Sequence, residues 1–160
     1  MTTIQSEFAD LKVFAFDSEV LGKEVASHLD IGLGRQINAK FNDGENHIRV
    51  LDSVKGQKVY VIKTFEDKNI NDGIMELLLA VSCIKREGAE RITAIIPFFP
   101  YSLPSVQAKD DINDGIDFFT SFGSDIVKLL EAVGCDEVIT LNSFMSSPKG
   151  FAQNSCFMNI

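Results

Sequence analysis

Short runs of consecutive apolar residues alternate along this chain with longer segments in which apolar residues recur every three or four positions. An unbroken apolar run is typical of a strand covered on both faces, and the longer spacing predicts an amphipathic helix. The runs predict strands at residues 11–16, 59–62, 92–96 and 138–141. The spaced segments predict helices from Ser18 to about Leu29, between residues 71 and 88, and between residues 122 and 134. This alternation predicts the fold class α/β, a three-layer, mostly parallel doubly wound sheet with helices on both faces.

Residues that favour helix ends stand at the expected places. Asp17 and Ser18 are both suited to the N-cap of the first helix, and Asn71 or Asp72 can cap the second. Gly88 and Gly134 follow the second and third helical segments. Because glycine easily adopts the left-handed backbone that ends many helices, we expect these helices to stop there.

The segment Phe41-Asn42-Asp43-Gly44-Glu45 predicts a tight turn joining two strands of a hairpin. The turn places an aromatic ring beside two carboxylates, a set that can bind a nucleotide. Phe41, Asp43 and Glu45 are therefore candidate nucleotide-binding residues. A local explanation also stands, because such a turn needs Gly44 and a side-chain hydrogen bond from Asn42 or Asp43.

Composition narrows the classes of partner and location. A chain of 160 residues, 45% of them hydrophobic, fits one domain with a real core. Its formal charge of −8 disfavours binding to nucleic acid or to an anionic membrane surface. The 3 cysteines lack the spacing of a disulfide framework or a zinc site. No targeting signal is recognised in the first residues, and no apolar run approaches the roughly 20 residues of a transmembrane segment. We expect an intracellular protein in a reducing compartment, cytoplasmic by default, with a mitochondrial location left open and no metal site.

Several segments, in this order, carry a resemblance to a known family. They are residues 41–45, 53–57, 71–72 with 75–78, 85–86 with 88–97, and 131–136 with 138–140. Each is weak alone, but their order and spacing make the match specific. From about Leu11 to Thr140 the chain resembles the N-terminal domain of ribose-phosphate pyrophosphokinase (phosphoribosyl diphosphate synthetase) and the noncatalytic proteins associated with that enzyme.

The resemblance implies a fold like that of the type I phosphoribosyltransferases. The family transfers diphosphate from magnesium-bound ATP to ribose 5-phosphate, a reaction that depends on positioning and on cations that neutralise phosphate charge. In the family, the turn contributes to an ATP site that is often shared between subunits. By resemblance, Phe41 would contact adenine, and Asp43 and Glu45 would accept hydrogen bonds from the base or ribose.

Two segments depart from the family pattern. After Pro97 the family has tyrosine, alanine, arginine, glutamine, aspartate, arginine and lysine, whereas residues 101–107 read Tyr-Ser-Leu-Pro-Ser-Val-Gln. Leu103, Val106 and Gln107 cannot supply the cationic contacts that ATP phosphates require. After the last predicted strand the family has aspartate, leucine and histidine, but this chain has Asn142-Ser143-Phe144. Phenylalanine has no lone pair for a metal or a proton.

The family continues into a second domain, which we expect to be absent here. We therefore expect an α/β domain over residues 1–142 and an irregular tail over residues 143–160. The tail is rich in aromatic residues, and exposed aromatic residues usually pack on another surface. We expect it to dock on a partner protein.

These departures favour a catalytically inactive protein that acts as a structural or regulatory subunit of a larger complex. Its partners would be synthetase homologues or an unrelated assembly, an organellar one included. No catalytic residue is assigned, and no cofactor is expected unless the turn is functional, in which case ATP or ADP with magnesium would bind. Two alternatives stay open: a module that completes a partner synthetase's ATP site, and an active enzyme that uses a separate second-domain chain.

Overall fold

The structure is a computed structural model that describes residues 10–65, 69–101, 122–141 and 156–159. The altered positions after Tyr101 and after Leu141 lie outside this described part. Among the described residues, no helix has the length and apolar character needed to cross a membrane.

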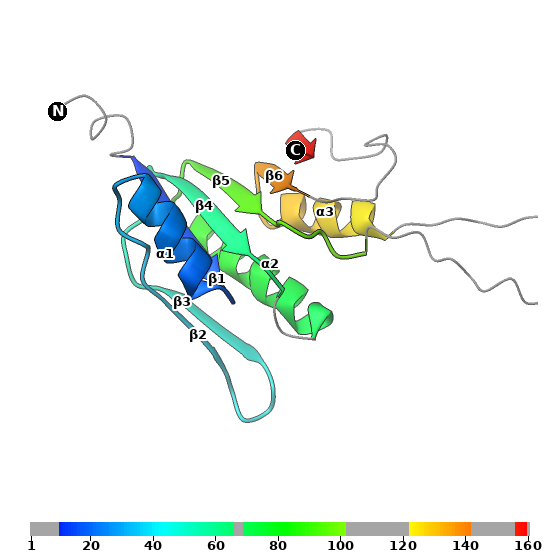
Figure 1. Cartoon of the computed structure of the whole chain (residues 1–160). Helices are drawn as coiled ribbons and strands as arrows, with labels where there is room; N and C mark the ends of the chain where they lie inside the picture. Colours follow the sequence, from blue (N-terminus) through cyan, green and yellow to red (C-terminus); the bar gives the residue numbers. More distant parts are fainter. Residues whose placement is uncertain (1–9, 66–68, 102–121, 142–155, 160) are drawn as a thin grey trace, which may run out of the picture.

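The main sheet contains five parallel strands in the order β1-β4-β5-β6-β7. These strands are β1 (Leu11–Phe16), β4 (Lys58–Lys63), β5 (Arg91–Ile95), β6 (Glu137–Thr140) and β7 (Cys156–Asn159). The helices are α1 (Glu19–His28), α2 (Ile70–Arg86) and α3 (Gly123–Ala132). The α1 helix lies on one face of the sheet, and α2 and α3 lie on the other (Figure 1). The predicted three-layer, mostly parallel α/β fold is confirmed.

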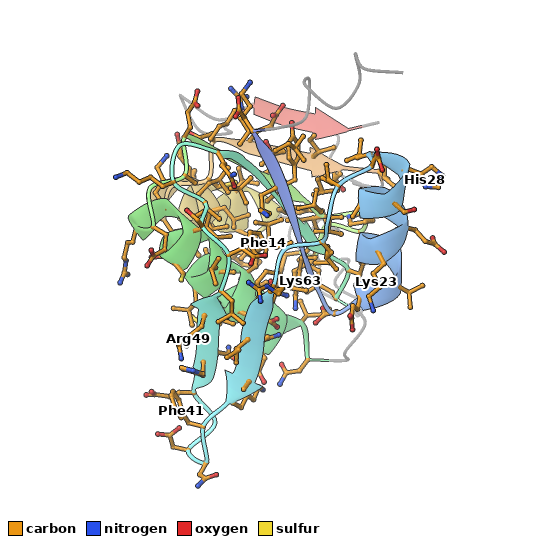
Figure 2. All side chains as sticks on the ribbon, turned by 90° about the vertical axis from the view of Figure 1, so that its left-hand side faces the viewer. Phe14, Lys23, His28, Phe41, Arg49 and Lys63 are labelled. Carbon is orange, nitrogen blue, oxygen red and sulfur yellow. The ribbon has the colours of Figure 1, made fainter. Side chains whose placement is uncertain are left out.

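Side chains of β1 and β4 alternate between the two faces of the sheet, as the pleat of a strand requires. Val13 and Ala15 of β1, with Ile62 of β4, form a small core under α1. Phe14 and Phe16 point to the opposite face and join the larger core under α2 and α3. Figure 2 shows Phe14 inside the molecule, with α1 on one side and α2 on the other.

A two-stranded antiparallel hairpin, β2 (Gln36–Lys40) and β3 (Asn46–Val50), forms a second sheet that projects from the body (Figure 1). The predicted hairpin is confirmed. Among the described residues its strands do not pair with those of the main sheet, although the Gln36 side chain of β2 donates to the Ala15 carbonyl oxygen of β1 at 2.6 Å. Partly buried Ile48 and Val50 pack against the larger core, so β3 docks the hairpin on the molecule.

Helix ends agree with the sequence in part. The Ser18 side chain accepts a hydrogen bond from the Leu21 N–H and caps α1. For α2 the predicted caps, Asn71 and Asp72, are wrong, because both residues lie inside the helix and the N-cap is Asn69. The helix begins before its regular apolar spacing does, since Asn71, Asp72 and Gly73 follow Ile70 in its first turn. Gly88 and Gly134 both have positive φ, of 87° and 104°, just after α2 and α3, which confirms the predicted stops.

The tail was predicted to be irregular, and this is wrong for residues 156–159. They form β7, which pairs in parallel with β6 through partners such as Val138 and Phe157. A strand of 4 residues is too short for a periodic pattern to reveal. The rest of the tail lies outside the described residues, so the domain boundary near residue 142 and the docking of the tail on a partner stay predictions.

Candidate functional site

The three candidate residues lie together at the tip of the hairpin. The strands end at the pair Lys40 and Asn46, and the Phe41 N–H donates to the Glu45 carbonyl oxygen at 2.9 Å. The Gly44 N–H donates to the Phe41 carbonyl oxygen at 3.0 Å, with Gly44 at a φ of 93° that favours glycine. The sequence predicted this turn correctly.

Side chains at the tip face solvent. Phe41 is 53% exposed, and its ring lies 4.9 Å from that of His47 at an interplanar angle of 55°. Asp43 and Glu45 are exposed as well. Figure 2 shows Phe41 close to the far end of the hairpin, away from the body. An open ring face beside two carboxylates can contact a ligand, and the described residues form no wall around it.

The local explanation for these residues also has support in the structure. The Asp43 Oδ1 accepts a hydrogen bond from the Glu45 N–H at 3.1 Å, which is the Asx-type contact that stabilises such turns. Asp43 therefore has a structural role whether or not it binds a ligand. Nucleotide contact by Phe41, Asp43 and Glu45 stays a prediction.

Polar side chains hold the stem of the hairpin against α2. Asn38 of β2 donates from Nδ2 to the Glu76 Oε1. Nearer the tip, the Lys40 ammonium is paired with the Asp72 carboxylate, and the Asn46 Nδ2 donates to the Asp72 carbonyl oxygen at 3.5 Å. The position of the tip is thus set by contacts between the hairpin and α2.

A buried ion cluster lies behind the Asn38 contact. The Lys63 side chain, at the end of β4, is 1% exposed. Its Nζ lies 2.7 Å from the Asp17 Oδ2 and 2.7 Å from the Glu76 Oε2. It also lies 5.5 Å from the centre of the Phe65 ring. Burial raises the pKa of the Glu76 carboxyl above its ordinary value, although the Lys63 ammonium acts in the opposite direction.

A second ion pair closes the base of the hairpin on its other side. The Asp52 carboxylate accepts from the Arg35 backbone N–H at 2.8 Å and from the Arg35 Nε at 2.9 Å. These hydrogen bonds lower the pKa of the Asp52 carboxyl. The pair ties the start of β2 to the segment that leaves β3.

A hollow of about 710 Å³ beside α1 is lined by Asp17, Gln36 and Asn38 among others. Its rim carries the cations Lys23 and Arg35. Lys23 is paired with Glu19 at 2.7 Å, and Arg35 with Asp52. Because both cations are already neutralised, this hollow has little positive charge to offer a phosphate.

Metal binding has no support in the described part of the chain. No group of three or more His, Cys, Asp or Glu side chains there is arranged to hold a metal ion.

Sequence reasoning missed Lys63, Asp17 and Glu76 as a cluster. One signal was available, because Glu76 lies on the buried face of α2 between Gly73 and Ala80. A carboxylate on an apolar helix face needs a buried cation, and a lysine directly follows the apolar run of β4.

Comparison with known proteins defines the family. A model of the N-terminal domain of ribose phosphate pyrophosphokinase matches residues 11–115. This chain belongs to the ribose-phosphate pyrophosphokinase family. The predicted family is confirmed, and the hairpin with its turn falls within the matched residues.

Full-length relatives resemble the chain over most of its length. Ribose-phosphate pyrophosphokinase A of Dictyostelium discoideum is 34% identical over 131 residues, which are 82% of this chain and 39% of the relative. Ribose-phosphate pyrophosphokinase 1 of Streptococcus pyogenes is 29% identical over 147 residues, which are 90% of this chain and 43% of the relative. The chain therefore spans less than half the length of these pyrophosphokinases.

A solved structure has the same fold. The crystal structure of phosphoribosylpyrophosphate synthetase from Mycobacterium smegmatis superposes with a TM-score of 0.76 at 26% sequence identity. The match covers 94% of this chain and 48% of that chain. The fold of this family member is thus that of the matched part of a phosphoribosylpyrophosphate synthetase.

Proposed function

We propose that this family member is a noncatalytic subunit of a larger assembly, with a structural or regulatory role beside a ribose-phosphate pyrophosphokinase. The observation that carries the proposal is the sequence after β5. Leu103, Val106 and Gln107 stand where the family resemblance calls for cationic contacts to ATP phosphates. A metal-bound triphosphate needs such charge in order to be held for reaction.

A second observation supports the same proposal. Phe144 stands where the resemblance calls for the histidine of the metal–nucleotide site. A phenyl ring can neither coordinate a metal nor transfer a proton. The positions that the resemblance assigns to arginine and lysine lie after β5, and the position that it assigns to histidine lies after β6. The differences therefore occur in two separate segments and are not a single local change.

Association with a partner is the direct test of the subunit role. The protein is mixed at micromolar concentration with the full-length pyrophosphokinase of the same organism and analysed by size-exclusion chromatography with light scattering. We expect one complex with a defined ratio of the two chains. Elution of both proteins at their separate masses, together with the absence of any stable complex after pull-down from the native source, would contradict the proposal.

The exposed hairpin tip favours a specific form of this function. The Phe41 ring is open to solvent at the end of the hairpin, and Asp43 and Glu45 are beside it. We propose that the tip contributes these three side chains to a nucleotide site completed by the partner chain. ATP or ADP with magnesium would then be bound by the assembly, and the phosphate contacts would come from the partner.

Charge-removing substitutions test the nucleotide role without breaking the turn. In Asp43→Asn the side-chain oxygen that accepts from the Glu45 N–H is kept, and Glu45→Gln has nearly the same shape as the original residue. Because a hydrogen bond to a charged group contributes about 1.5–3 kcal/mol, the double variant should weaken ATP binding by the complex about tenfold or more.

Glu90→Gln, at an exposed position far along the chain from the tip, is the matched control and should leave the affinity unchanged. Equal ATP affinity of the complex with the original protein and with the double variant would refute the nucleotide role. The association test would still decide the subunit role.

A further inference from the structure

The buried Lys63 ammonium connects parts of the chain that are distant in sequence. Lys63 ends β4, Asp17 lies in the turn between β1 and α1, and Glu76 lies on α2. Taking an ammonium out of water is costly unless opposite charges and hydrogen bonds compensate. The two carboxylates at 2.7 Å provide this compensation, so the three elements meet at one point.

Glu76 uses its two oxygens for two different tasks. Its Oε2 is held by the Lys63 ammonium, and its Oε1 accepts from the Asn38 amide of β2. A Glu side chain that is free to change rotamer would not hold a strand in one place. The contact with Lys63 fixes the carboxylate, and the fixed carboxylate holds the hairpin.

The hairpin depends on such contacts because it is not part of the main sheet. An isolated two-stranded hairpin is marginally stable in water. The ion pair between the hairpin and α2, Lys40 with Asp72, has side chains that are 51% and 43% exposed, and exposed pairs contribute little. The Glu76 side chain is 11% exposed, so its contact is protected from solvent screening.

We propose that Lys63 is a positioning residue that fixes the orientation of the β2–β3 hairpin through Glu76 and Asn38. The hairpin in turn carries the Phe41–Glu45 turn, so Lys63 sets where that turn stands relative to the body. Figure 2 shows Lys63 where the hairpin leaves the body, at the opposite end from Phe41. The consequence for nucleotide binding rests on the proposed function, but the positioning itself does not.

Amide hydrogen exchange of the protein without nucleotide or partner tests the inference. The change is Lys63→Met, and the readout is the exchange rate of the hairpin amides, Phe41 and Gly44 among them, relative to amides of β5. We expect hairpin amides to exchange about tenfold faster after the loss of one buried charge-assisted contact. Lys58→Met, at the exposed start of the same strand, is the control and should leave the hairpin amides unchanged.

A double variant, Lys63→Met with Asn38→Ala, distinguishes positioning of the hairpin by Lys63 from a general loss of protein stability. Asn38→Ala should also raise hairpin exchange about tenfold. If Lys63 acts through Glu76 on Asn38, both changes break the same link, and the double variant should exchange no faster than the faster single variant. Independent effects would multiply to about a hundredfold.

The inference is overturned if hairpin amides in Lys63→Met are as protected, relative to β5, as they are in Lys58→Met. It is also overturned if the two effects multiply. Should Lys63→Met not fold, Lys63→Gln takes its place, because an amide keeps a donor but lacks the reach and charge of the ammonium. A failure of ATP to bind the complex would refute the nucleotide role and leave these exchange results unaffected.

Discussion

At the scale of single residues, burial decides what each titratable group can do. Lys63 stays in the core because Asp17 and Glu76 surround its ammonium. Cys135 is buried, and burial raises the pKa of its thiol to about 11. Asp52 has the opposite environment, since the Arg35 backbone and guanidinium groups lower the pKa of its carboxyl.

The two cysteines whose side chains are described should differ in reactivity. The thiolate is the nucleophile, and Cys135 is 4% exposed and carries a proton at neutral pH. Cys83 is only partly buried, on α2. A short pulse of a thiol-alkylating reagent on the folded protein, followed by peptide mass spectrometry, should label Cys83 and leave Cys135 unmodified. Equal labelling of both sites in the folded protein would show that the β6 region is open.

The Arg35–Asp52 pair should support the fold only above a certain pH. The pKa of Asp52 is lower in the folded state than its ordinary value of 3.8. Its contribution is therefore present above that value and is lost as the pH falls through the folded-state pKa. Urea unfolding is measured as the pH is lowered from 6 to below the ordinary pKa of an aspartate. The free energy of unfolding should fall less for Asp52→Asn than for the original protein. Parallel pH profiles would mean that the pair adds nothing.

The cluster around Lys63 was not predicted from the sequence, for reasons that lie in its individual residues. The apolar run of β4 predicts a strand but does not say that the next residue turns inward. Asp17 was interpreted as a helix cap, yet its carboxylate pairs with Lys63 and Ser18 caps the helix. Such pairs join residues that are distant in the chain, so local patterns carry little information about them.

At the scale of elements, periodicity predicted most of the secondary structure. Strands that are buried on both faces, such as β4, and helices with a clear apolar stripe, such as α2, were found because burial alone shapes their sequence. The α3 helix was found, but only some of its apolar residues face the core: Val127 and Leu130 are buried, whereas Phe122 and Leu129 are 55% and 48% exposed. Pattern alone does not fix which side of a short helix meets the core.

Close packing between elements gives a test at this scale. A Cβ on Gly34 would come within 2.5 Å of the Phe14 ring. The backbone between α1 and β2 therefore lies directly against β1 at this residue. Gly34→Ala should lower the free energy of unfolding by about 1–3 kcal/mol through overpacking. Gly32→Ala, where a Cβ would meet nothing within 4 Å, is the control and should change it by less than about 1 kcal/mol. Equal urea midpoints for the two variants would contradict the packing described here.

The candidate site was predictable in one respect and not in another. The turn was found because Gly44 and the polar residues beside it have a strong local preference. The contacts that hold the hairpin on α2, from Asn38 and Lys40, were not found, because each joins residues more than 30 positions apart. The sequence thus indicated the tip but not what positions it.

At the scale of the whole molecule, the chain has the fold of a pyrophosphokinase N-terminal domain, and it matches 39% and 43% of the length of two such enzymes. Its sheet matches that of a family member, whereas Leu103, Val106, Gln107 and Phe144 stand where the family resemblance calls for cationic and imidazole groups. A chain that has the family fold but other residues at the charged positions fits the proposed role beside a partner. The proposed subunit role rests on this contrast, whereas the positioning by Lys63 rests on the contacts of Glu76 with Lys63 and Asn38.

Turnover by the purified 160-residue chain is the most direct test of the account. The protein is incubated with magnesium, ATP and ribose 5-phosphate, and 5-phosphoribosyl 1-diphosphate is measured by mass spectrometry against a sample without protein. We predict no product above that background. Product formation that disappears after a point change in this chain, such as Asp43→Ala, would contradict the noncatalytic role.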